Sequence, residues 1–81
     1  MPIIKFYSKT CGPCKVLSRI LDKNSIQHIS LDIMDEHSQE LIDKYNIISV
    51  PTLLKVDDEG NIIDKLKDIK ESTVIEFCNE K

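Results

Sequence analysis

Apolar and polar residues are spaced along this chain in two ways, which predict strands in some segments and helices in others. Short and largely apolar runs predict four strands, at residues 3–7, 26–32, 52–56 and 62–66. Apolar residues that recur every three or four positions predict three helices, at residues 11–23, 35–45 and from 72 onward. The order βαβαββα indicates an α/β protein with a four-stranded sheet flanked by three helices.

The connections between these segments make the predicted sheet a mixed one. A helix between the first two strands requires a right-handed crossover, which makes these two strands parallel. Turn-forming residues at 57–61 predict a hairpin, so the last two strands run antiparallel. Ser72 is suited to cap the last helix. No linker, repeat or low-complexity segment interrupts the chain, and we expect one domain at residues 1–81.

The helical spacing also predicts which side chains face the core. In the first helix, Cys14, Leu17 and Leu21 fall on one side, and Val16 and Ile20 flank them. Charged residues fall on the other side of this helix, at Lys15, Arg19 and Asp22. The inward residues predicted for the other two helices are Leu41, Ile42, Tyr45, Val74, Ile75, Phe77 and Cys78.

Composition and charge narrow the functional classes. With 41% hydrophobic and 31% charged residues, the chain is typical of a globular domain. A net charge of −3, without a run of Lys or Arg among aromatic residues, argues against nucleic-acid binding. No stretch approaches the roughly 20 apolar residues of a membrane span, and the start lacks the pattern of a signal peptide. We expect a cytoplasmic monomer whose three cysteines are one redox or metal-binding pair and one further thiol.

The segment Cys11-Gly12-Pro13-Cys14 directly follows the first predicted strand and begins the first predicted helix. Cysteines three positions apart in a first helical turn are about 5–6 Å apart, within the roughly 4.4–6.8 Å between Cα atoms that a disulfide needs. Pro13 fits this turn, where its missing N–H would have no partner. The pair can therefore form and break a disulfide without unfolding the chain.

Cys11 is the predicted nucleophile of this pair. Unpaired N–H groups and the positive end of the helix dipole stabilise a thiolate at the helix N-terminus. Lys9 and Lys15 add positive charge nearby, and together these effects should lower the pKa of the Cys11 thiol from about 8.5 towards neutrality. Cys14 lies one turn further in, is expected to be less exposed, and is the predicted resolving thiol.

A metal site is the alternative use of the two cysteines. Structural zinc needs four ligands, and the chain has no second Cys-x-x-Cys motif. The remaining His and Cys residues, His28, His37 and Cys78, lie far apart in the chain without ligand spacing. We therefore expect no bound metal, structural or surface roles for the histidines, and a small buried hydrophobe at Cys78.

Three features in this order resemble the thioredoxin superfamily across nearly the whole chain. They are Cys11-Gly12-Pro13-Cys14 after the first strand, Ser49-Val50-Pro51-Thr52 before the third strand, and the order of the elements. The resemblance implies a thioredoxin fold in which Pro51 is cis and packs against the disulfide, while Val50 offers backbone groups to an extended substrate. With Thr10, these residues would form the docking edge.

The resemblance also implies function and partners. A thioredoxin reduces protein disulfides by dithiol–disulfide exchange without a bound cofactor, and an NADPH-dependent thioredoxin reductase recycles it. Ribonucleotide reductase is a target implied by glutaredoxin-like thioredoxins, which the segment Tyr7-Ser8-Lys9 resembles.

Two alternatives remain open from the residues. One is a glutaredoxin recycled by glutathione, against which the lack of glycine in Leu66-Lys67-Asp68-Ile69-Lys70 counts. The other is a non-catalytic interaction module in which the cysteine pair binds metal.

The chain departs from the thioredoxin pattern at two positions beside the motif. Thr10 stands where thioredoxins usually have Trp, which alters the hydrophobic docking rim. Lys5 stands where they have a buried acid beneath the disulfide. Lys5 is expected either to favour the thiolate from there or to extend its ammonium to solvent.

Overall fold

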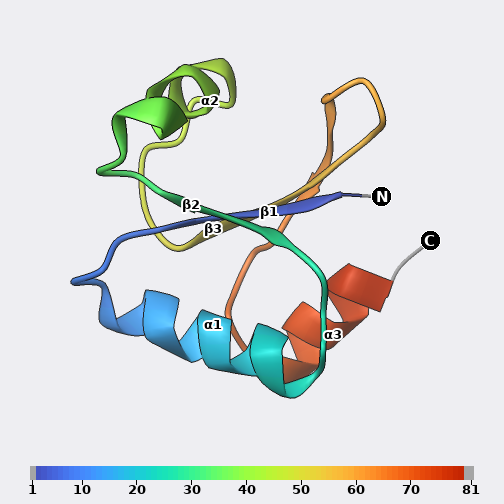
Figure 1. Ribbon diagram of the computed structural model, residues 1–81. Coiled ribbons are helices and arrows are strands. Elements are labelled where there is room, and N and C mark those ends of the chain that lie inside the picture. The colour runs from blue at the N-terminus through green and yellow to red at the C-terminus, as the bar shows by residue number, and fades with distance from the viewer. Residues whose placement is uncertain (1, 80–81) are drawn as a thin grey trace.

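The computed structural model describes residues 2–79, with the predicted order of helices and strands (Figure 1). A 3-10 turn, η1, precedes the second helix. The bounds are β1 Ile3–Tyr7, α1 Gly12–Lys23, β2 Ile29–Asp32, η1 Glu36–Ser38, α2 Gln39–Lys44, β3 Thr52–Val56, β4 Ile62–Lys65 and α3 Glu71–Asn79.

The four strands form one mixed sheet in the order β2-β1-β3-β4. β1 runs parallel to β2, with Ile4 opposite Ile29, and antiparallel to β3, with Phe6 opposite Thr52. β4 pairs with β3 in the predicted hairpin. Figure 1 shows α1 and α3 on one face of the sheet and α2 on the other. The predicted mixed sheet with three flanking helices is confirmed.

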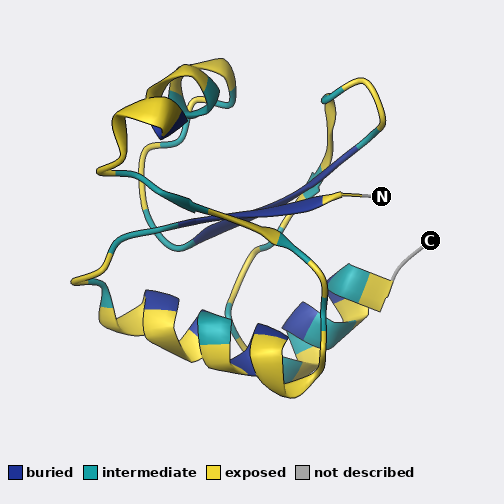
Figure 2. Cartoon of the chain, in the orientation of Figure 1, coloured by how far each residue is buried: buried dark blue, intermediate teal, exposed yellow. Residues whose placement is uncertain are grey.

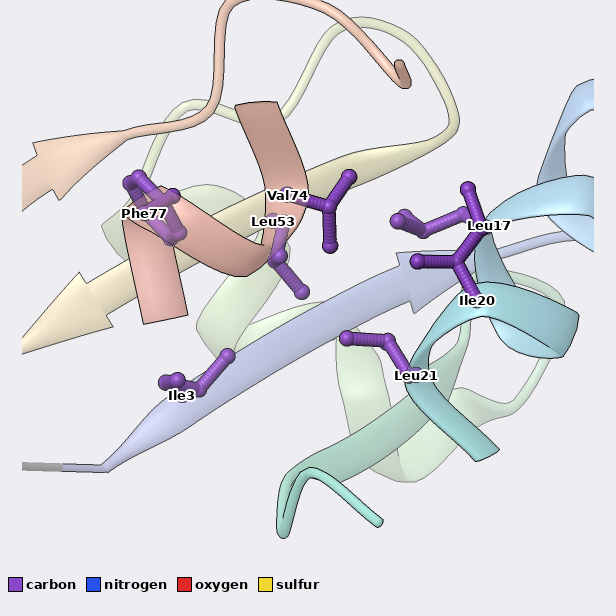
Figure 3. Packing of buried hydrophobic residues seen from close by; sticks show 7 residues of the cluster. All are labelled: Ile3, Leu17, Ile20, Leu21, Leu53, Val74 and Phe77. Atoms are coloured by element: carbon purple, nitrogen blue, oxygen red, sulfur yellow. The ribbon is translucent and has the colours of Figure 1, made fainter. Parts of the chain in front are cut away.

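The two central strands are buried on both faces, which explains their continuous apolar runs. On the face towards α1 and α3, side chains from β1, β3 and these two helices point towards one another (Figure 3). They are Ile3, Leu17, Ile20, Leu21, Leu53, Val74 and Phe77. The α2 face buries Ile4, Phe6, Leu54 and Val56. Each large side chain that is fully buried contributes about 1.5–3 kcal/mol, so these layers fix the position of α1 and of the cysteines at its start.

The second strand is shorter than predicted because the end of α1 takes up its first residues. Ser25 has a positive φ of 54°, and the Ile26 N–H donates to the Leu21 carbonyl at 2.9 Å. This bond closes the last turn of the helix. Ile26 therefore packs against the α1 and α3 core, and pairing with β1 starts only at Ile29.

Two further boundary predictions are wrong. The helix predicted at 35–45 begins as the 3-10 turn η1, because the Asp35 carboxylate accepts the His37 N–H at 3.0 Å and starts a tighter turn. Ser72 does not cap α3, since the helix already begins at Glu71.

Val16 does not flank the core, because it is 44% exposed on α1.

No helix within residues 2–79 is both long enough and apolar enough to cross a bilayer.

Candidate active site

The strand register brings the cysteine motif and the proline segment to the same end of the sheet. Phe6 lies opposite Thr52, so the carboxyl end of β1 lies beside the start of β3. The loop that enters α1 and the loop that carries Pro51 therefore emerge together (Figure 1). The peptide bond between Val50 and Pro51 is cis.

Cys11 is the N-cap of α1, and its own sulfur takes part in the cap. Its backbone is extended, with φ −91° and ψ 113°, as is usual for a residue that precedes a helix. The Cys14 N–H donates to the Cys11 Sγ at 3.2 Å. Pro13 lies in the first turn and leaves no additional N–H unsatisfied there. The sulfur thus occupies a position where unpaired N–H groups and the helix dipole favour negative charge.

A disulfide joins Cys11 to Cys14, with 5.2 Å between the two Cα atoms. This separation lies within the roughly 4.4–6.8 Å that Cα atoms span across disulfides. The two cysteines differ in access, since Cys11 is half-buried while Cys14 is 1% exposed. An incoming sulfur can therefore reach Cys11 more easily than Cys14.

The residues around the motif are mostly exposed. Lys9 is 82% exposed at its side chain and lies 3.9 Å from the Asp32 carboxylate, a weak surface ion pair. Lys15 is exposed on the first turn of α1, and Thr10 is exposed beside the motif. Apart from its chain neighbours and the backbone of α1, a Cβ at Gly12 would meet nothing within 4 Å, so tertiary packing does not require glycine there.

Lys5 is buried below α1 and does not extend to solvent. Its residue is 5% exposed, and its Nζ donates to the Ser18 Oγ at 2.6 Å and lies 5.2 Å from the centre of the Tyr7 ring. Burial lowers the pKa of the Lys5 amine, and the nearby Asp22 carboxylate opposes this shift. Ser18 lies one turn after Cys14 on α1, so Lys5 joins β1 to the turn that carries the inner cysteine.

Val50 and Pro51 are half-buried at the docking edge predicted from the sequence. Val50 packs against the core cluster on the α2 face of the sheet. The Thr52 hydroxyl donates to the Ser49 carbonyl at 2.7 Å, which fixes the turn that leads into β3. Ile48 is 84% exposed next to this turn, so an apolar side chain stands at the rim.

The other candidate residues lie apart from the cysteine pair along the chain. His28 Nδ1 lies 2.9 Å from the Ile26 carbonyl, and His37 lies in η1. Cys78 is a free thiol on α3, half-buried against the α1 and α3 core, and burial raises its pKa while Lys55 opposes the shift. Within residues 2–79, no group of three or more His, Cys, Asp or Glu side chains could hold a metal ion.

Sequence reasoning overlooked Ser18 as a partner of Lys5. The only available signal was its spacing of four from Cys14, which puts both residues on one side of the helix. The sequence could not indicate that the Lys5 amine turns towards α1, because this depends on how the helix packs on β1.

This arrangement can perform reversible thiol–disulfide chemistry. A half-buried cysteine at a helix N-terminus and a buried partner cysteine three residues later are suited to thiol–disulfide exchange. The fold and the cysteine pair together define a dithiol–disulfide protein.

Comparison with known proteins gives the family. The family model described as Thioredoxin matches residues 1–80, and the chain belongs to the thioredoxin family. The chain is 31% identical to mouse mitochondrial thioredoxin over 85 residues, which cover 98% of this chain and 49% of the mouse protein. It spans about half the length of the mammalian mitochondrial relatives that it matches.

Two further comparisons concern a protein of similar length and a solved structure. A thioredoxin-like protein derived from the SPbeta prophage of Bacillus subtilis is 26% identical over 80 residues, which cover 99% of this chain and 98% of that protein. The solution structure of oxidised thioredoxin from Plasmodium falciparum superposes with a TM-score of 0.76 at 24% identity, covering 96% of this chain and 77% of that chain. The second comparison supports the fold.

Proposed function

We propose that this chain is a protein-disulfide reductase, which carries two electrons on Cys11 and Cys14. The observation that carries the proposal is the position of Cys11, which is half-buried and caps α1 with its sulfur, while Cys14 is buried one turn inside. Membership of the thioredoxin family supports the same activity. The redox couple consists of the protein's own sulfurs, so the reaction needs no bound cofactor.

The reaction has two exchange steps. The Cys11 thiolate attacks one sulfur of the substrate disulfide, forms a mixed disulfide and releases the other substrate sulfur as a thiolate that takes up a proton. The Cys14 sulfur, after losing its proton, then attacks the Cys11 sulfur and breaks the mixed disulfide. The second substrate thiol leaves, the substrate has gained two electrons and two protons, and Cys11 and Cys14 are joined again.

Val50, Pro51 and Thr10 are the proposed docking residues for this step. Val50 and Pro51 lie at the same end of the sheet as Cys11, where an extended substrate chain can approach the sulfur. Lys9 and Lys15 contribute positive charge on either side of the motif, which favours the Cys11 thiolate.

The proposal includes partners and a compartment. We propose that an NADPH-dependent thioredoxin reductase returns the electrons, and that ribonucleotide reductase is one candidate target. A dithiol that must be reduced again after each turnover requires a reducing compartment, for which we propose the cytoplasm. We propose that the protein acts as a monomer.

The test is the reduction of insulin, measured as the precipitation of the separated insulin chains. The assay is run with each of two recycling systems. NADPH with thioredoxin reductase should sustain the reaction, whereas glutathione with glutathione reductase should not. Cys11→Ser should fall to the background rate, and Cys14→Ser should accumulate a mixed disulfide with insulin. The matched control is Cys78→Ser, which should keep the wild-type rate, and full activity of Cys11→Ser would contradict the proposal.

A further inference from the structure

A groove of about 740 Å³ runs along α1 beside the end of β1, and the exchange reaction as described leaves it unused. Its lining includes Cys14 and continues for two turns along the helix to Lys23. The groove therefore begins at the redox pair and leads away from the Val50 edge. A partner that is joined to Cys11 has its neighbouring residues within reach of this surface.

The groove is lined by cations on a chain that is acidic overall. Four lining residues are basic, whereas the chain carries a net charge of −3. The only acidic residue in the lining is Asp22. The basic residues of the lining are Lys9, Lys15, Arg19 and Lys23.

Part of this positive charge is neutralised locally, and part is not. Lys9 lies 3.9 Å from Asp32, and Lys23 lies 3.3 Å from Glu71 at the far end of the groove. Both pairs involve exposed lysines and hold them weakly. Within residues 2–79, no ion pair engages Lys15 or Arg19. These two side chains are exposed one turn apart on α1, whose exposed outer side is visible in Figure 2.

We propose that this basic groove docks an acidic segment of the protein whose disulfide is exchanged. The inference rests on the proposed function, since the target is covalently joined to Cys11 while the segment lies in the groove. From Lys15 to Lys23 the helix rises about 12 Å, the length of about four extended residues. The fitting partner thus carries a short run of Asp or Glu near its reactive cysteine, and charge attraction mainly speeds their encounter.

The experiment uses three synthetic peptides that share one intramolecular disulfide and differ only in the four residues that follow it. These four residues are Glu, Gln or Lys, and the measured quantity is the second-order rate constant for reduction by the pre-reduced protein. At low salt we expect the Glu peptide to react about two- to fivefold faster than the Gln peptide, and the Lys peptide more slowly. The ratio of the rate constant of the Glu peptide to that of the Gln peptide should fall towards one at about 0.5 M salt.

Matched variants assign the effect to the groove. Arg19→Gln with Lys23→Gln removes two groove charges that lie outside the cysteine motif. Lys44→Gln with Lys65→Gln removes two charges on the α2 face of the sheet, away from the groove. Lys44 lies in α2, and Lys65 lies opposite Leu54, whose side chain belongs to the core cluster on that face. The first double variant should have a smaller preference for Glu and keep its rate on the Gln peptide, whereas the second should keep the full preference. An unchanged preference in the groove variant would overturn the proposal.

A second measurement separates this inference from the proposed function. If the wild type reduces none of the peptides, the reductase proposal fails, and docking is measured directly with a cysteine-free, fluorescein-labelled tetraglutamate peptide and the oxidised protein. Binding that Arg19→Gln with Lys23→Gln abolishes supports the groove. Absence of binding, or tighter groove-dependent binding of single-stranded DNA, overturns it.

Discussion

Removing the Ser18 hydroxyl should destabilise the oxidised protein at neutral pH, because the buried Lys5 amine would lose its acceptor. The two atoms lie 2.6 Å apart and Lys5 is 5% exposed, but Ser18 also lines the groove along α1, so water that enters from the groove can offset part of the loss. A hydrogen bond to a charged group contributes about 1.5–3 kcal/mol. Alanine is the better helix former by about 0.5 kcal/mol, so Ser18→Ala should lower the free energy of unfolding by about 1–2.5 kcal/mol.

A double-mutant cycle isolates this interaction from the helix propensity. Lys5→Met keeps an unbranched apolar stem on β1 and removes the amine. In the Lys5→Met background no buried amine depends on the Ser18 hydroxyl. Ser18→Ala should therefore leave the free energy of unfolding unchanged or raise it by about 0.5 kcal/mol. The coupling energy should be about 1.5–3 kcal/mol.

The assay is urea unfolding of the four oxidised proteins at pH 7. Far-UV circular dichroism monitors the unfolding, because the chain has no Trp whose fluorescence could report it. Each kcal/mol corresponds to a shift in Tm of about 4–8 °C for a domain of this size. Burial lowers the folded-state pKa of Lys5, so the cost of burying its charge is present below that pKa and is relieved as the pH rises through it. The penalty of Ser18→Ala should shrink over the same interval. An equal effect of Ser18→Ala in both backgrounds would refute the reasoning.

Three further predictions concern single positions. Gly12→Ala should change the free energy of unfolding by less than about 1 kcal/mol and leave insulin reduction intact, because the entropy that alanine saves is opposed by the contact of its Cβ with Pro13 and no more distant atom lies within 4 Å; a loss of more than about 2 kcal/mol in urea would contradict this. Cys78 in the reduced protein should react with iodoacetamide more slowly than free cysteine at pH 8, because burial raises its pKa; equal rates would contradict this. Asp57 accepts hydrogen bonds from the N–H group of Asn61 and from that of Glu59, and the Asn61 bond contributes most to lowering its pKa. Its stabilising effect is therefore present above about pH 4 and lost as the pH falls through the lowered pKa. The difference in Tm between the wild type and Asp57→Ala should narrow on acidification, and a constant difference would contradict this.

Sequence reasoning succeeded where one strong pattern determined an element. The runs at 3–7 and 52–56 predicted β1 and β3 with the observed bounds, because central strands buried on both faces read as continuous apolar segments. The helical spacing after Cys11 likewise predicted α1 to Lys23. The motif also showed where the two sulfurs could meet, since three positions on a first turn fix their separation.

The sequence did not predict the structure where polar side chains compete for backbone groups, or where tertiary packing determines the position of a side chain. Asp35 diverts the start of the second helix into η1, and Ser25 bends the chain so that Ile26 closes α1. Both effects depend on local hydrogen bonds that periodicity does not report. The orientation of Lys5 and the basic groove follow from the docking of α1 on β1, which no local pattern specifies.

The central claim is that Cys11, at the N-terminus of α1, is the reactive thiol of the pair. The most direct measurement is the pH dependence of alkylation by iodoacetamide at each cysteine of the reduced protein, resolved by peptide mass spectrometry. We predict that Cys11 reacts first, with a midpoint well below the value of about 8.5 for a free cysteine. Preferential reaction of Cys14, or a midpoint for Cys11 near 8.5, would contradict the claim.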